Sequence, residues 1–394
     1  MAKPKIRFKG YQDDWEQRKL SEIAIRVTEK NKNNEFTEPF TNSAELGIIS
    51  QKEYFEREIV NDENLGGYYI VRKDDFVYNP RISGTAPVGP INRNRLERNG
   101  VMSPLYTVFR VHDIADLYLE YYFKTTNWHR FMKLNGDSGA RFDRFTISST
   151  QFMEMPIPYP EVEEQKKIGA YFDHLDHLIT LHQRKCEETK KLKKFMLQKM
   201  FPQNGSLVPE IRFDGFTDDW EQRKLGDFGK ATGGTSIESE FSEDGIYKVI
   251  SIGSYSENSV YNDQGIRAIK SDKTSNRILN RNDLTMILND KTTSGNIIGR
   301  VLLIEESGIY VYNQRTERIE INLDEYDPVF LYEMLNAPNI REKIIKQAQG
   351  NTQIYVNWTA ISLLEYMIPS KEEQVKIGEY LHSISNLITL HQQK

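Results

Sequence analysis

Residues able to do chemistry are grouped at only a few places in this chain of 394 residues. One group is Asp173, His174, Asp176 and His177, in which a carboxylate and an imidazole each recur three residues apart. Residues three apart share one face of a helix, so this pattern could bind a metal ion. A related stretch at residues 382–386 reads His-Ser-Ile-Ser-Asn, and no cysteine joins either group. We therefore predict no metal site.

Patterns typical of catalysis or nucleotide binding are incomplete or absent. Glu164-Gln165-Lys166 has the carboxylate-x-lysine form of some nuclease sites, but it lies in an amphipathic segment and its later copy is spaced differently. Asn79-Pro80-Arg81-Ile82 lacks the second proline and the aromatic residue of the Asn/Asp-Pro-Pro-aromatic motif of amino-methyltransferases. The sequence has no Gly-x-x-x-x-Gly-Lys-Ser/Thr loop for a nucleoside triphosphate, and no glycine-rich turn for a methyl donor stands out. We predict no catalytic residue and no cofactor in this chain.

Composition indicates a multidomain protein of a reducing compartment. The length exceeds that of one ordinary core, and 38% hydrophobic residues are enough to bury two or more cores. The chain has one cysteine, Cys186, and no apolar run of about 18 residues, so we expect a cytoplasmic protein without a disulfide or a membrane span. The 52 basic and 57 acidic residues give a net charge of −5, which argues against indiscriminate coating of nucleic acid but allows local basic surfaces.

The elements that must position any functional side chain occur twice. Asp13–Leu20 and Asp218–Leu225 both read DDWEQRKL, and each follows an Ile-Arg-Phe-x-Gly segment. The two tryptophans are 205 residues apart (220 − 15), whereas a Glu-Glu-Gln-x-Lys-Ile-Gly segment recurs after 209 (372 − 163). The second copy therefore carries four more residues between its flanks (209 − 205). The sequence predicts a duplicated module with shared flanks and divergent interiors.

The segment from Glu163 to Met200 is predicted to be one long helix. Its apolar seam advances in alternating steps of four and three residues, as in a coiled coil, with polar residues on the outside. At about 1.5 Å per residue this helix would span on the order of 55 Å, and Pro202 would end it. The alternative is one face of an ordinary core helix, against which the length and the polar outer face weigh. The seam residues are Ile168, Phe172, Leu175, Ile179, His182, Cys186 and Thr189.

Each interior is predicted to be a mixed α/β domain with the same order of elements. In the first we expect strands at 68–71, 76–78 and 105–109, and a helix from Asp113, its N-cap, to Lys133. In the second we expect strands at 247–252, 297–304 and 309–312, and a helix near Pro328 to Gln347. The predicted domains are 1–160, a spacer helix with its linker at 161–208, 209–370, and a short distal helix at 371–394.

With these features the chain resembles the specificity subunit of a type I restriction-modification enzyme. The resemblance covers nearly the whole sequence, and the residues that carry it are Phe8-Lys9-Gly10, Trp15 and Leu20, their copies Phe213-Asp214-Gly215, Trp220 and Leu225, the two Glu-Glu-Gln helices, and Asp75–Arg81. It implies an α+β fold: two mixed α/β target recognition domains separated by a long antiparallel pair of helices, a coiled coil, with a pseudo-two-fold internal repeat. One departure is that Lys394 aligns with Lys185, so the second helix is shorter than the first.

The resemblance also implies a non-catalytic protein that recognises double-stranded DNA. Each interior would read one half of an asymmetric bipartite target, and the helices would set the gap between the halves. Two methyltransferase subunits would dock on the chain and motor-nuclease subunits would join them, so S-adenosylmethionine, ATP and magnesium would act in those partners. The scaffold residues would be Trp15, Leu20, Trp220, Leu225, Ile168, Phe172, Leu175 and Ile179.

Candidate DNA-binding side chains lie in basic, amide-rich loops, because arginine and amide groups read base edges and also contact phosphates. They are Arg81, Arg93, Arg95, Arg141 and Arg144 in the first interior, and Lys291, Thr292, Arg300, Asn313, Arg315, Asn351 and Gln353 in the second. Two other classes of function stay open. A protein–protein scaffold would bind every DNA sequence alike, and a catalytic fusion is disfavoured by the missing motifs.

Overall fold

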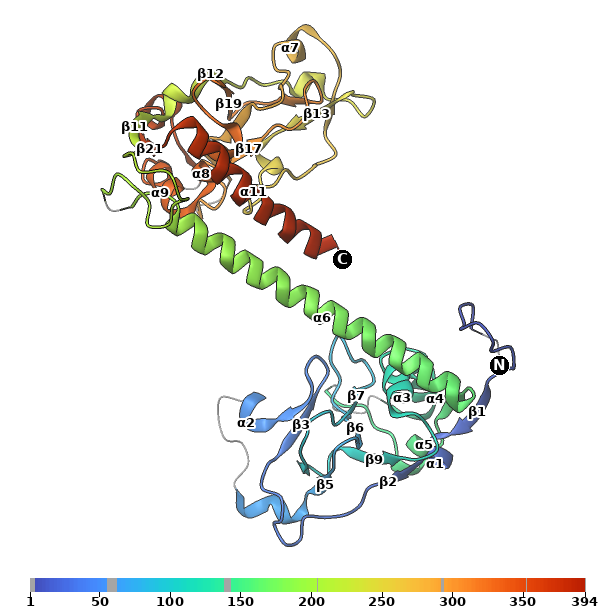
Figure 1. The fold of residues 1–394 in the computed structure, drawn as a ribbon. Coiled ribbons are helices and arrows are strands. Elements are labelled where there is room, and N and C mark those ends of the chain that lie inside the picture. The colour runs from blue at the N-terminus through green and yellow to red at the C-terminus, as the bar shows by residue number, and fades with distance from the viewer. Residues whose placement is uncertain are drawn as a thin grey trace. The chain divides into compact units, whose positions relative to one another are not determined.

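The computed structural model describes residues 4–54, 62–137, 143–203, 205–291, 294–351 and 353–393. The chain forms two compact units, Met1–Ile179 and Thr180–Lys394, here called unit 1 and unit 2 (Figure 1). The boundary falls inside helix α6, Val162–Lys199, which contributes its first half to unit 1 and its second half to unit 2. The duplication of the sequence is therefore also a division of the fold.

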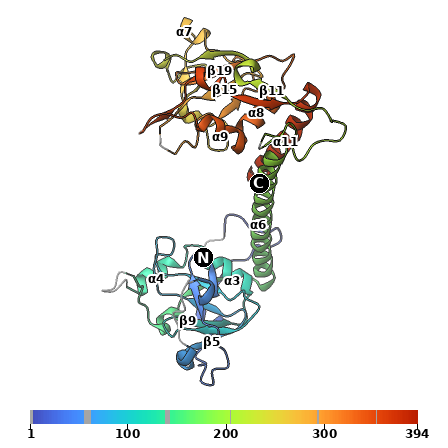
Figure 2. The same cartoon turned by 90° about the vertical axis from the view of Figure 1, so that its left-hand side faces the viewer.

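Unit 1 consists of short strands and helices, as both views in Figures 1 and 2 show. Before α6 the elements are β1 (Glu16–Lys19), α1 (Leu20–Ile23), β2 (Ala24–Arg26), β3 (Phe40–Ser43), β4 (Gly47–Ser50), α2 (Gln51–Tyr54), the 3-10 turn Asp62–Gly67, β5 (Tyr69–Val71), β6 (Phe76–Tyr78), β7 (Ile91–Arg93), β8 (Gly100–Met102), β9 (Thr107–Val111), α3 (Asp116–Phe123), α4 (His129–Asn135), α5 (Ser149–Met153) and β10 (Pro156–Tyr159).

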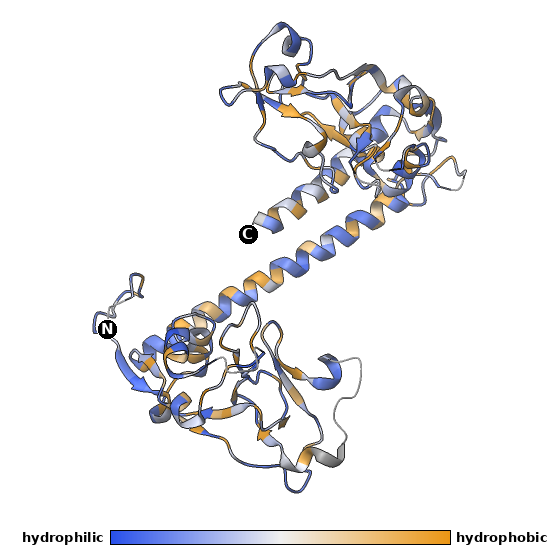
Figure 3. Cartoon of the chain, turned by 180° about the vertical axis from the view of Figure 1, so that it is seen from behind, coloured by the Kyte–Doolittle hydropathy of each residue, from blue (hydrophilic) through white to orange (hydrophobic). Residues whose placement is uncertain are grey.

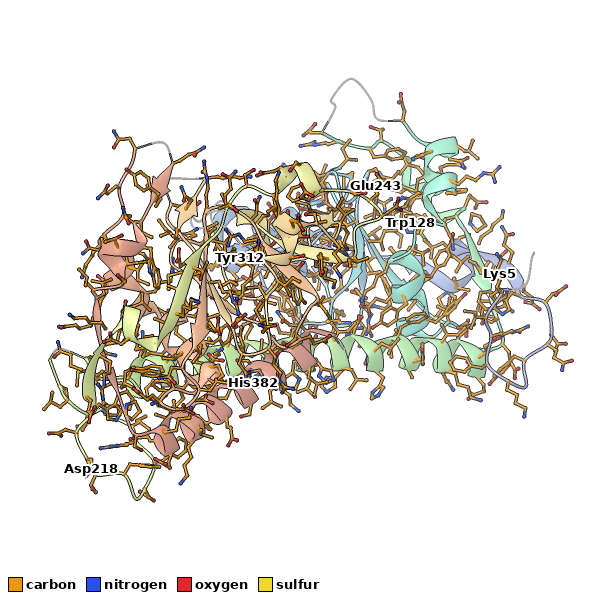
Figure 4. The ribbon with its side chains drawn as sticks, turned by 90° about the horizontal axis from the view of Figure 1, so that it is seen from above. Lys5, Trp128, Asp218, Glu243, Tyr312 and His382 are labelled. Carbon is orange, nitrogen blue, oxygen red and sulfur yellow. The ribbon has the colours of Figure 1, made fainter. Side chains whose placement is uncertain are left out.

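The main sheet of unit 1 has the strand order β2-β9-β6-β7, with all neighbours antiparallel. In its register Phe76 faces Phe109, and both rings lie in one core with Phe123 of α3 and Phe152 of α5. Trp128 joins this core and donates its indole N–H to the Phe123 carbonyl (Figure 4). Helices α3 and α5 therefore pack on the face of the sheet that carries the phenylalanines.

Unit 2 has its own set of elements after α6. They are β11 (Glu221–Lys224), the 3-10 turn Leu225–Phe228, β12 (Gly229–Gly233), the 3-10 turn Glu238–Glu240, β13 (Tyr247–Ile250), the 3-10 turn Ile252–Ser254, β14 (Arg267–Ala268), α7 (Asp272–Ser275), β15 (Leu284–Ile287), β16 (Asn289–Asp290), β17 (Val301–Leu303), β18 (Tyr310–Tyr312), β19 (Thr316–Ile321), α8 (Pro328–Asn336), α9 (Pro338–Ile345), β20 (Ile354–Tyr355), α10 (Trp358–Ile361), β21 (Glu365–Ile368) and α11 (Lys371–Gln393).

Two sheets form the body of unit 2. One has the order β12-β19-β15-β17 and buries Leu284 and Ile319 against Phe330 of α8. The other has the order β14-β13-β18, in which β13 and β18 run parallel. Tyr312 at the end of β18 is fully buried, and the Arg277 guanidinium lies 5.4 Å from its ring centroid (Figure 4). Each unit thus has its own sheets and its own core.

The two DDWEQRKL copies adopt the same structure. Strand β1 pairs antiparallel with β10, and β11 pairs with β21 in the equivalent register. Leu20 and Leu225 follow these strands and are completely buried. Their backbone N–H groups donate hydrogen bonds of 2.8 and 2.9 Å to Met155 and Leu364, just before β10 and β21. Each copy therefore ties the start of a divergent interior to its end.

In unit 2 the second half of α6 packs beside α11. Lys193 Nζ lies 2.6 Å from Ser385 Oγ, and the rings of His182 and His391 are 5.7 Å apart. Residue numbers fall along α6 as they rise along α11, so the two helices are antiparallel. Apolar positions recur along both (Figure 3). The predicted antiparallel helix pair is confirmed for the part that lies within unit 2.

Both predicted interior helices are broken into two. Residues 113–133 yield α3 and most of α4, and residues 328–347 yield α8 and α9, because Pro338 has no N–H with which to continue a helix. Asp113 is not an N-cap, since it has a φ of 53°. The N–H of Ala115, before α3, instead donates to the Gln165 side chain at 2.9 Å. The hydrogen-bond acceptor at the start of α3 is therefore a side chain of α6, far along the sequence.

The strand predicted at 76–78 is found with the same bounds as β6. The other predicted strands are present with altered ends, and 297–304 is a strand only at Val301–Leu303. None of the helices in the described ranges has the length and apolar character needed to cross a membrane.

Candidate nucleic-acid interface and scaffold joints

The contact of Arg7 and Trp15 with Glu164, here called the first joint, fastens the N-terminal segment to the start of α6. Arg7 donates to both carboxylate oxygens of Glu164, with Nε–Oε1 and Nη2–Oε2 distances of 2.6 and 2.8 Å. Glu164 is fully buried and also accepts a hydrogen bond from Trp15 Nε1 at 3.2 Å. The hydrogen bond to Glu164 raises the pKa of Arg7, so the pair stays charged. A buried carboxylate needs such a partner, which makes this contact a fixed point of the fold.

The second joint repeats the same clamp. Arg212 donates to both oxygens of Glu373, each at 2.8 Å, and the pKa of Arg212 is raised by that hydrogen bond. The tryptophans differ. Trp220 is only 2% exposed and its Nε1 has no hydrogen-bond partner among the described residues, whereas Trp15 is partly exposed. The joints therefore share their ion pair and differ in how deeply the indole is covered.

A glutamine and a glycine complete each joint. Buried Gln165 and Gln374 accept hydrogen bonds of 2.9 Å from the backbone N–H groups that precede α3 and α8. At Gly169 an added Cβ would lie 2.6 Å from α3, and at Gly378 it would lie 2.8 Å from α8. The helices approach too closely for a side chain, so the repeated Glu-Glu-Gln-x-Lys-Ile-Gly segment is a packing requirement.

The predicted seam of α6 is only partly covered. Ile168 and Leu175 are partly buried and Cys186 is buried, but Phe172 and Ile179 remain 44% and 51% exposed. The heptad pattern predicted burial at both exposed positions. Tyr121 of α3 contacts the Phe172 ring, with 5.4 Å between the centroids, but Phe172 and Ile179 both stay substantially exposed.

A polar cleft of about 720 Å³ opens in the divergent interior of unit 1. Its floor is a network of amides in which Asn42 Nδ2 donates to the Val77 carbonyl and Asn79 Nδ2 donates to the Asn42 carbonyl, both at 2.7 Å. Three tyrosines and the exposed Arg81 stand around it. The lining residues that matter here are Asn42, Tyr54, Tyr68, Asn79, Arg81 and Tyr106.

Two arginines face each other beside this cleft. Arg81 and Arg144 form an isolated antiparallel bridge, supported by a hydrogen bond of 2.7 Å from Phe145 N–H to the Pro80 carbonyl. The buried Nε of Arg144 lies 3.7 Å from the Asp143 carboxylate and has no hydrogen-bond partner among the described residues. No ion pair of Arg81 occurs within the described part of the chain. Like charges directly opposite one another are unfavourable, so this pair is suited to an anion.

Unit 2 has a different set of polar side chains, which lie beside the pairing of β16 with β20. Strand β16 pairs with β20, Asp290 facing Ile354, which places Lys291 beside Gln353. The Arg315 carbonyl accepts from Leu288 N–H just before β16, so Arg315 reaches the same ladder. Asn351 lies in the loop before β20, and Lys291, Arg315, Asn351 and Gln353 are all exposed. The structure thus brings four of the predicted residues together.

Arg93 and Arg95 are instead bound to acids. Both donate to Glu120, which is 8% exposed, at 2.7 and 2.8 Å. Arg93 also pairs with Asp74 at 3.0 Å, and Arg95 pairs with Asp173 of α6 at 3.0 Å. These contacts anchor β7 to α3 and α6, so the two arginines are committed to the fold and are poorly placed for base reading.

Two predicted residues of unit 2 are likewise occupied. Arg300 donates to the Asn296 carbonyl and to Ser259 Oγ, and burial lowers its pKa. Asn313 is 6% exposed and its amide bonds Ile237 and Glu238. Both are correctly placed in loops by the sequence but serve internal contacts. Arg141 and Thr292 lie outside the described residues.

No group of three or more metal-ligating side chains exists within the described ranges. Asp173 pairs with Arg95, and Asp176 pairs with Lys124 at 2.8 Å and accepts from Tyr121 at 2.9 Å. The carboxylates of the sequence pattern are used to hold α6 against α3.

Sequence reasoning missed the hairpin β3–β4 and with it the cleft residues Thr41 and Asn42. A signal for it existed, because Gly47 separates two short β-prone runs and adopts a φ of 69°, which favours glycine. The strands are four residues each, too short to show a clear alternation.

Repeated joints that carry divergent polar interiors define a two-domain recognition scaffold, and the sequence comparison agrees. The model of the type I restriction modification DNA specificity domain matches residues 12–191 and 217–394, so the chain belongs to this family. The MjaVIII specificity subunit of a type I restriction enzyme from Methanocaldococcus jannaschii is 27% identical over 247 residues, 61% of this chain and 57% of that relative. The MjaIX specificity subunit of the same organism is 26% identical over 163 residues, 39% and 36% of the two chains. The chain therefore matches about half the length of these relatives or less.

Solved structures show the same fold. The type I restriction-modification S subunit from M. genitalium aligns with a TM-score of 0.61 at 12% identity, over 100% of this chain and 94% of that one. A chain from a study of complex assembly and conformational transition of the type I R-M system aligns with a TM-score of 0.50 at 14% identity, over 97% and 93%.

Proposed function

We propose that this chain is the non-catalytic DNA-recognition subunit of a type I restriction-modification complex, and that each unit reads one half of an asymmetric bipartite target. The observation that carries the proposal is that two matching joints bear two different polar surfaces. Identical segments are unable to distinguish two half-sites, so sequence information resides in the interiors. Membership of the DNA specificity family supports this assignment.

In unit 1 the proposed reading surface is the cleft with Arg81 and Arg144 beside it. The Asn42 and Asn79 amides are bonded to backbone carbonyls, so they shape the floor. Arg81 is the exposed cation of this surface, and an arginine side chain contacts phosphates and base edges. We assign Arg93 and Arg95 to support of this surface.

In unit 2 the proposed reading surface is the ladder of β16 and β20. Asn351 and Gln353 bear amides, which suit the paired donor and acceptor of adenine, while Lys291 and Arg315 suit guanine or phosphate. Arg300 and Asn313 hold the loops behind them. Because the two surfaces differ in every reading residue, the target is asymmetric.

The joints are proposed to dock two methyltransferase subunits, since each presents the same surface once. S-adenosylmethionine chemistry would belong to those subunits, and ATP and magnesium chemistry to motor-nuclease subunits. Helix α6 runs unbroken from one unit into the other, so it is proposed to set the gap between half-sites.

The test is the exchange of one interior. Residues 21–162 are replaced by those of another family member, the subunit is produced with its methyltransferase partners, and methylated sites are sequenced. We expect one half-site to change and the other to persist. The control is Lys166→Val, which introduces the residue that the second copy has at this position (Val375), changes the scaffold only and should leave the target intact. A change of both half-sites, or equal affinity for all DNA sequences, would contradict the proposal, the latter in favour of a protein–protein scaffold.

A further inference from the structure

A buried ion pair recurs in both divergent interiors and shows how their residues correspond. Asp75 is 0% exposed and accepts from Arg110 Nε and Nη2 at 2.7 and 2.9 Å. Asp283 is 3% exposed and accepts from Arg318 Nε and Nη2 at 2.8 and 3.2 Å. Each arginine follows its aspartate by 35 residues, and each aspartate also accepts from the backbone N–H three residues before it, at 2.8 and 2.7 Å. Asp283 is therefore the counterpart of Asp75.

The correspondence continues to the edge of the unit 1 cleft. Pro80 and Leu288 each come five residues after these aspartates (80 − 75 and 288 − 283). The Pro80 carbonyl accepts from Phe145 N–H at 2.7 Å, and the Leu288 carbonyl accepts from Val356 N–H at 2.8 Å. Phe145 and Val356 are both buried. The same backbone hydrogen bond is therefore present in both units, and the residues next to it correspond.

The units differ at the pair of residues that comes next. In unit 1 Arg81 lies opposite Arg144, and in unit 2 Asn289 lies opposite Tyr355. The side chains of a directly opposed antiparallel pair lie side by side on one face. Each backbone therefore presents two adjacent side chains at the same place, which are two cations in unit 1 and an amide and a phenol in unit 2.

The unit 2 pair lies on the side of its strands that faces away from the core. Ile354, next to Tyr355 in β20, packs on the core of unit 2. Asp290, next to Asn289 in β16, is 4% exposed and accepts from Ile297 N–H at 3.2 Å. Because side chains alternate along a strand, Asn289 and Tyr355 point to the opposite side, where Tyr355 is 44% exposed.

This outward side also carries residues of the proposed reading surface. Lys291 and Gln353 are exposed and lie two residues from Asn289 and Tyr355, so the same alternation places all four on one side. Within the described ranges the side chains of Asn289 and Tyr355 form no hydrogen bond. The fold therefore leaves both side chains available to a ligand.

We propose that Asn289 and Tyr355 contact bases of the second half-site, at the position where Arg81 and Arg144 contact the DNA backbone of the first. This inference rests on the proposed function and adds two specificity-determining residues to it. An asparagine side chain binds adenine through one donor and one acceptor, whereas two adjacent arginines suit the charge of a phosphate. One backbone position thus provides charge in unit 1 and base reading in unit 2.

The test uses the chain together with its methyltransferase partners. Binding is measured to duplexes in which each base pair of the second half-site is replaced in turn. In Asn289→Ala and in Tyr355→Ala we expect discrimination to fall by about tenfold or more at one or two base pairs and to persist at the others. The salt dependence of binding should stay unchanged, because neither substitution removes a cation.

Asn322→Ala is the matched control. Asn322 is exposed and directly follows β19, whereas Thr316, at the opposite end of β19, pairs with Ile287 just before β16. The control therefore removes an amide at the far end of the same sheet. It should keep the discrimination of the parent at every base pair.

A double exchange tests the correspondence of the two positions. Asn289→Arg combined with Tyr355→Arg gives unit 2 the pair that unit 1 has. At about 0.9 for each phosphate contact, the slope of log affinity against log salt concentration should steepen by about 2. Discrimination should be lost at the same base pairs that the alanine variants affect. An unchanged slope would overturn the inference, because the two positions would then lie away from the DNA.

The alanine variants separate this inference from the proposed function. If the parent discriminates and both alanine variants keep its full discrimination, the inference is wrong and the proposed function stands. A uniform loss at every base pair would also overturn the inference, because the pair would then only support the fold. A parent that binds all replaced duplexes alike would instead contradict the proposed function itself.

Discussion

At the scale of single residues, the acids around each arginine decide what that arginine can do. Arg93 and Arg81 are twelve positions apart in one sequence, and both lie in polar surroundings (93 − 81). Arg93 has a side chain 12% exposed and bonds Glu120 and Asp74, whereas Arg81 is exposed beside Arg144. A guanidinium that is already neutralised has little left for a phosphate. The structure therefore separates reading arginines from structural ones by their partners.

Arg81→Gln and Arg144→Gln should each weaken DNA binding and lower its salt dependence. Each phosphate contact contributes about 0.9 to the slope of log affinity against log salt concentration, so each variant should reduce that slope by about 1. The measurement is binding to the cognate duplex between low and physiological salt. Arg95→Gln is the control, since it removes the same charge from a residue held by Glu120 and Asp173. An equal change in all three variants would show that net charge alone is responsible.

Glu317 should make unit 2 less stable as the pH rises. This residue of β19 is 6% exposed, and it forms no ion pair within the described ranges. Its neighbours across the sheet are Gly233 and Met286, and neither offers a charged partner. Burial raises the pKa of Glu317 from 4.5 to about 7. Between these values the folded state holds a proton that the unfolded state has released, so stability is full below pH 4.5 and falls until about pH 7.

Glu317→Gln should remove this dependence, because the amide stays neutral at every pH. The loss in the parent protein is at most roughly 3 kcal/mol, at about 1.36 kcal/mol for each pKa unit. Denaturant unfolding at pH 5 and pH 8 measures it, with Glu320→Gln on the same strand as the control at an exposed carboxylate. A parent protein equally stable at both pH values would refute the raised pKa.

At the scale of elements, the scaffold was the easier part to predict. The long helix was expected at 163–200 and is found at Val162–Lys199, because its period, length and terminal proline all agree. Repetition also revealed the joints, since matching flanks indicate matching contacts. The Arg7–Glu164 and Arg212–Glu373 pairs were not predicted, although both lie in the repeated segments. A sequence pattern shows that residues are shared and does not show which of them touch.

The interiors were harder to predict because their elements are short and depend on distant partners. Strands of three or four residues are too short to show a clear alternation of apolar and polar residues. The hairpin β3–β4 was not predicted for this reason. The start of α3 is bonded by Gln165, fifty residues away, so no local signal marked it. Four of the candidate DNA-binding residues are bonded to other groups of the fold, namely Arg93, Arg95, Arg300 and Asn313. A loop arginine or asparagine has the same local sequence whether its side chain faces solvent or a partner within the fold.

Trp15→Ala and Trp220→Ala should destabilise the two units unequally. Trp220 is 2% exposed between Phe201 and Phe330, so its removal should cost about 3–5 kcal/mol. Trp15 is partly exposed and should cost less, although its hydrogen bond to Glu164 is lost. Thermal unfolding with hydrogen exchange assigns each loss to its unit. Both variants should keep the parent methylation motif, and an altered motif would mean that the joints take part in base reading.

At the scale of the whole molecule, α6 is the helix that contributes residues to both units. In unit 1 Asp176 of α6 contacts Tyr121 and Lys124, and in unit 2 His182 of α6 contacts the His391 ring. Between them lies a short stretch of helix, 177–181, in which an insertion disturbs neither set of contacts. A site near Glu187 would instead shift α6 against α11, because that part of α6 is paired within unit 2.

Inserting four helix-forming residues after Ile179 should lengthen the gap in the DNA target by one base pair. Four residues add about 6 Å and turn the helix by about 40°. One base pair adds about 3.4 Å, and at about 10.5 base pairs per turn it rotates the next half-site by roughly 34°. Two base pairs would match the length but would overrotate by nearly 30°, so phase favours one. The measurement is sequencing of methylated sites in cells that carry the variant and its partners. Four residues inserted after Gln203, beyond the end of α6, serve as the control and should leave the gap unchanged. If the gap stays the same with full methylation, the partner subunits set the distance and α6 only links the two readers.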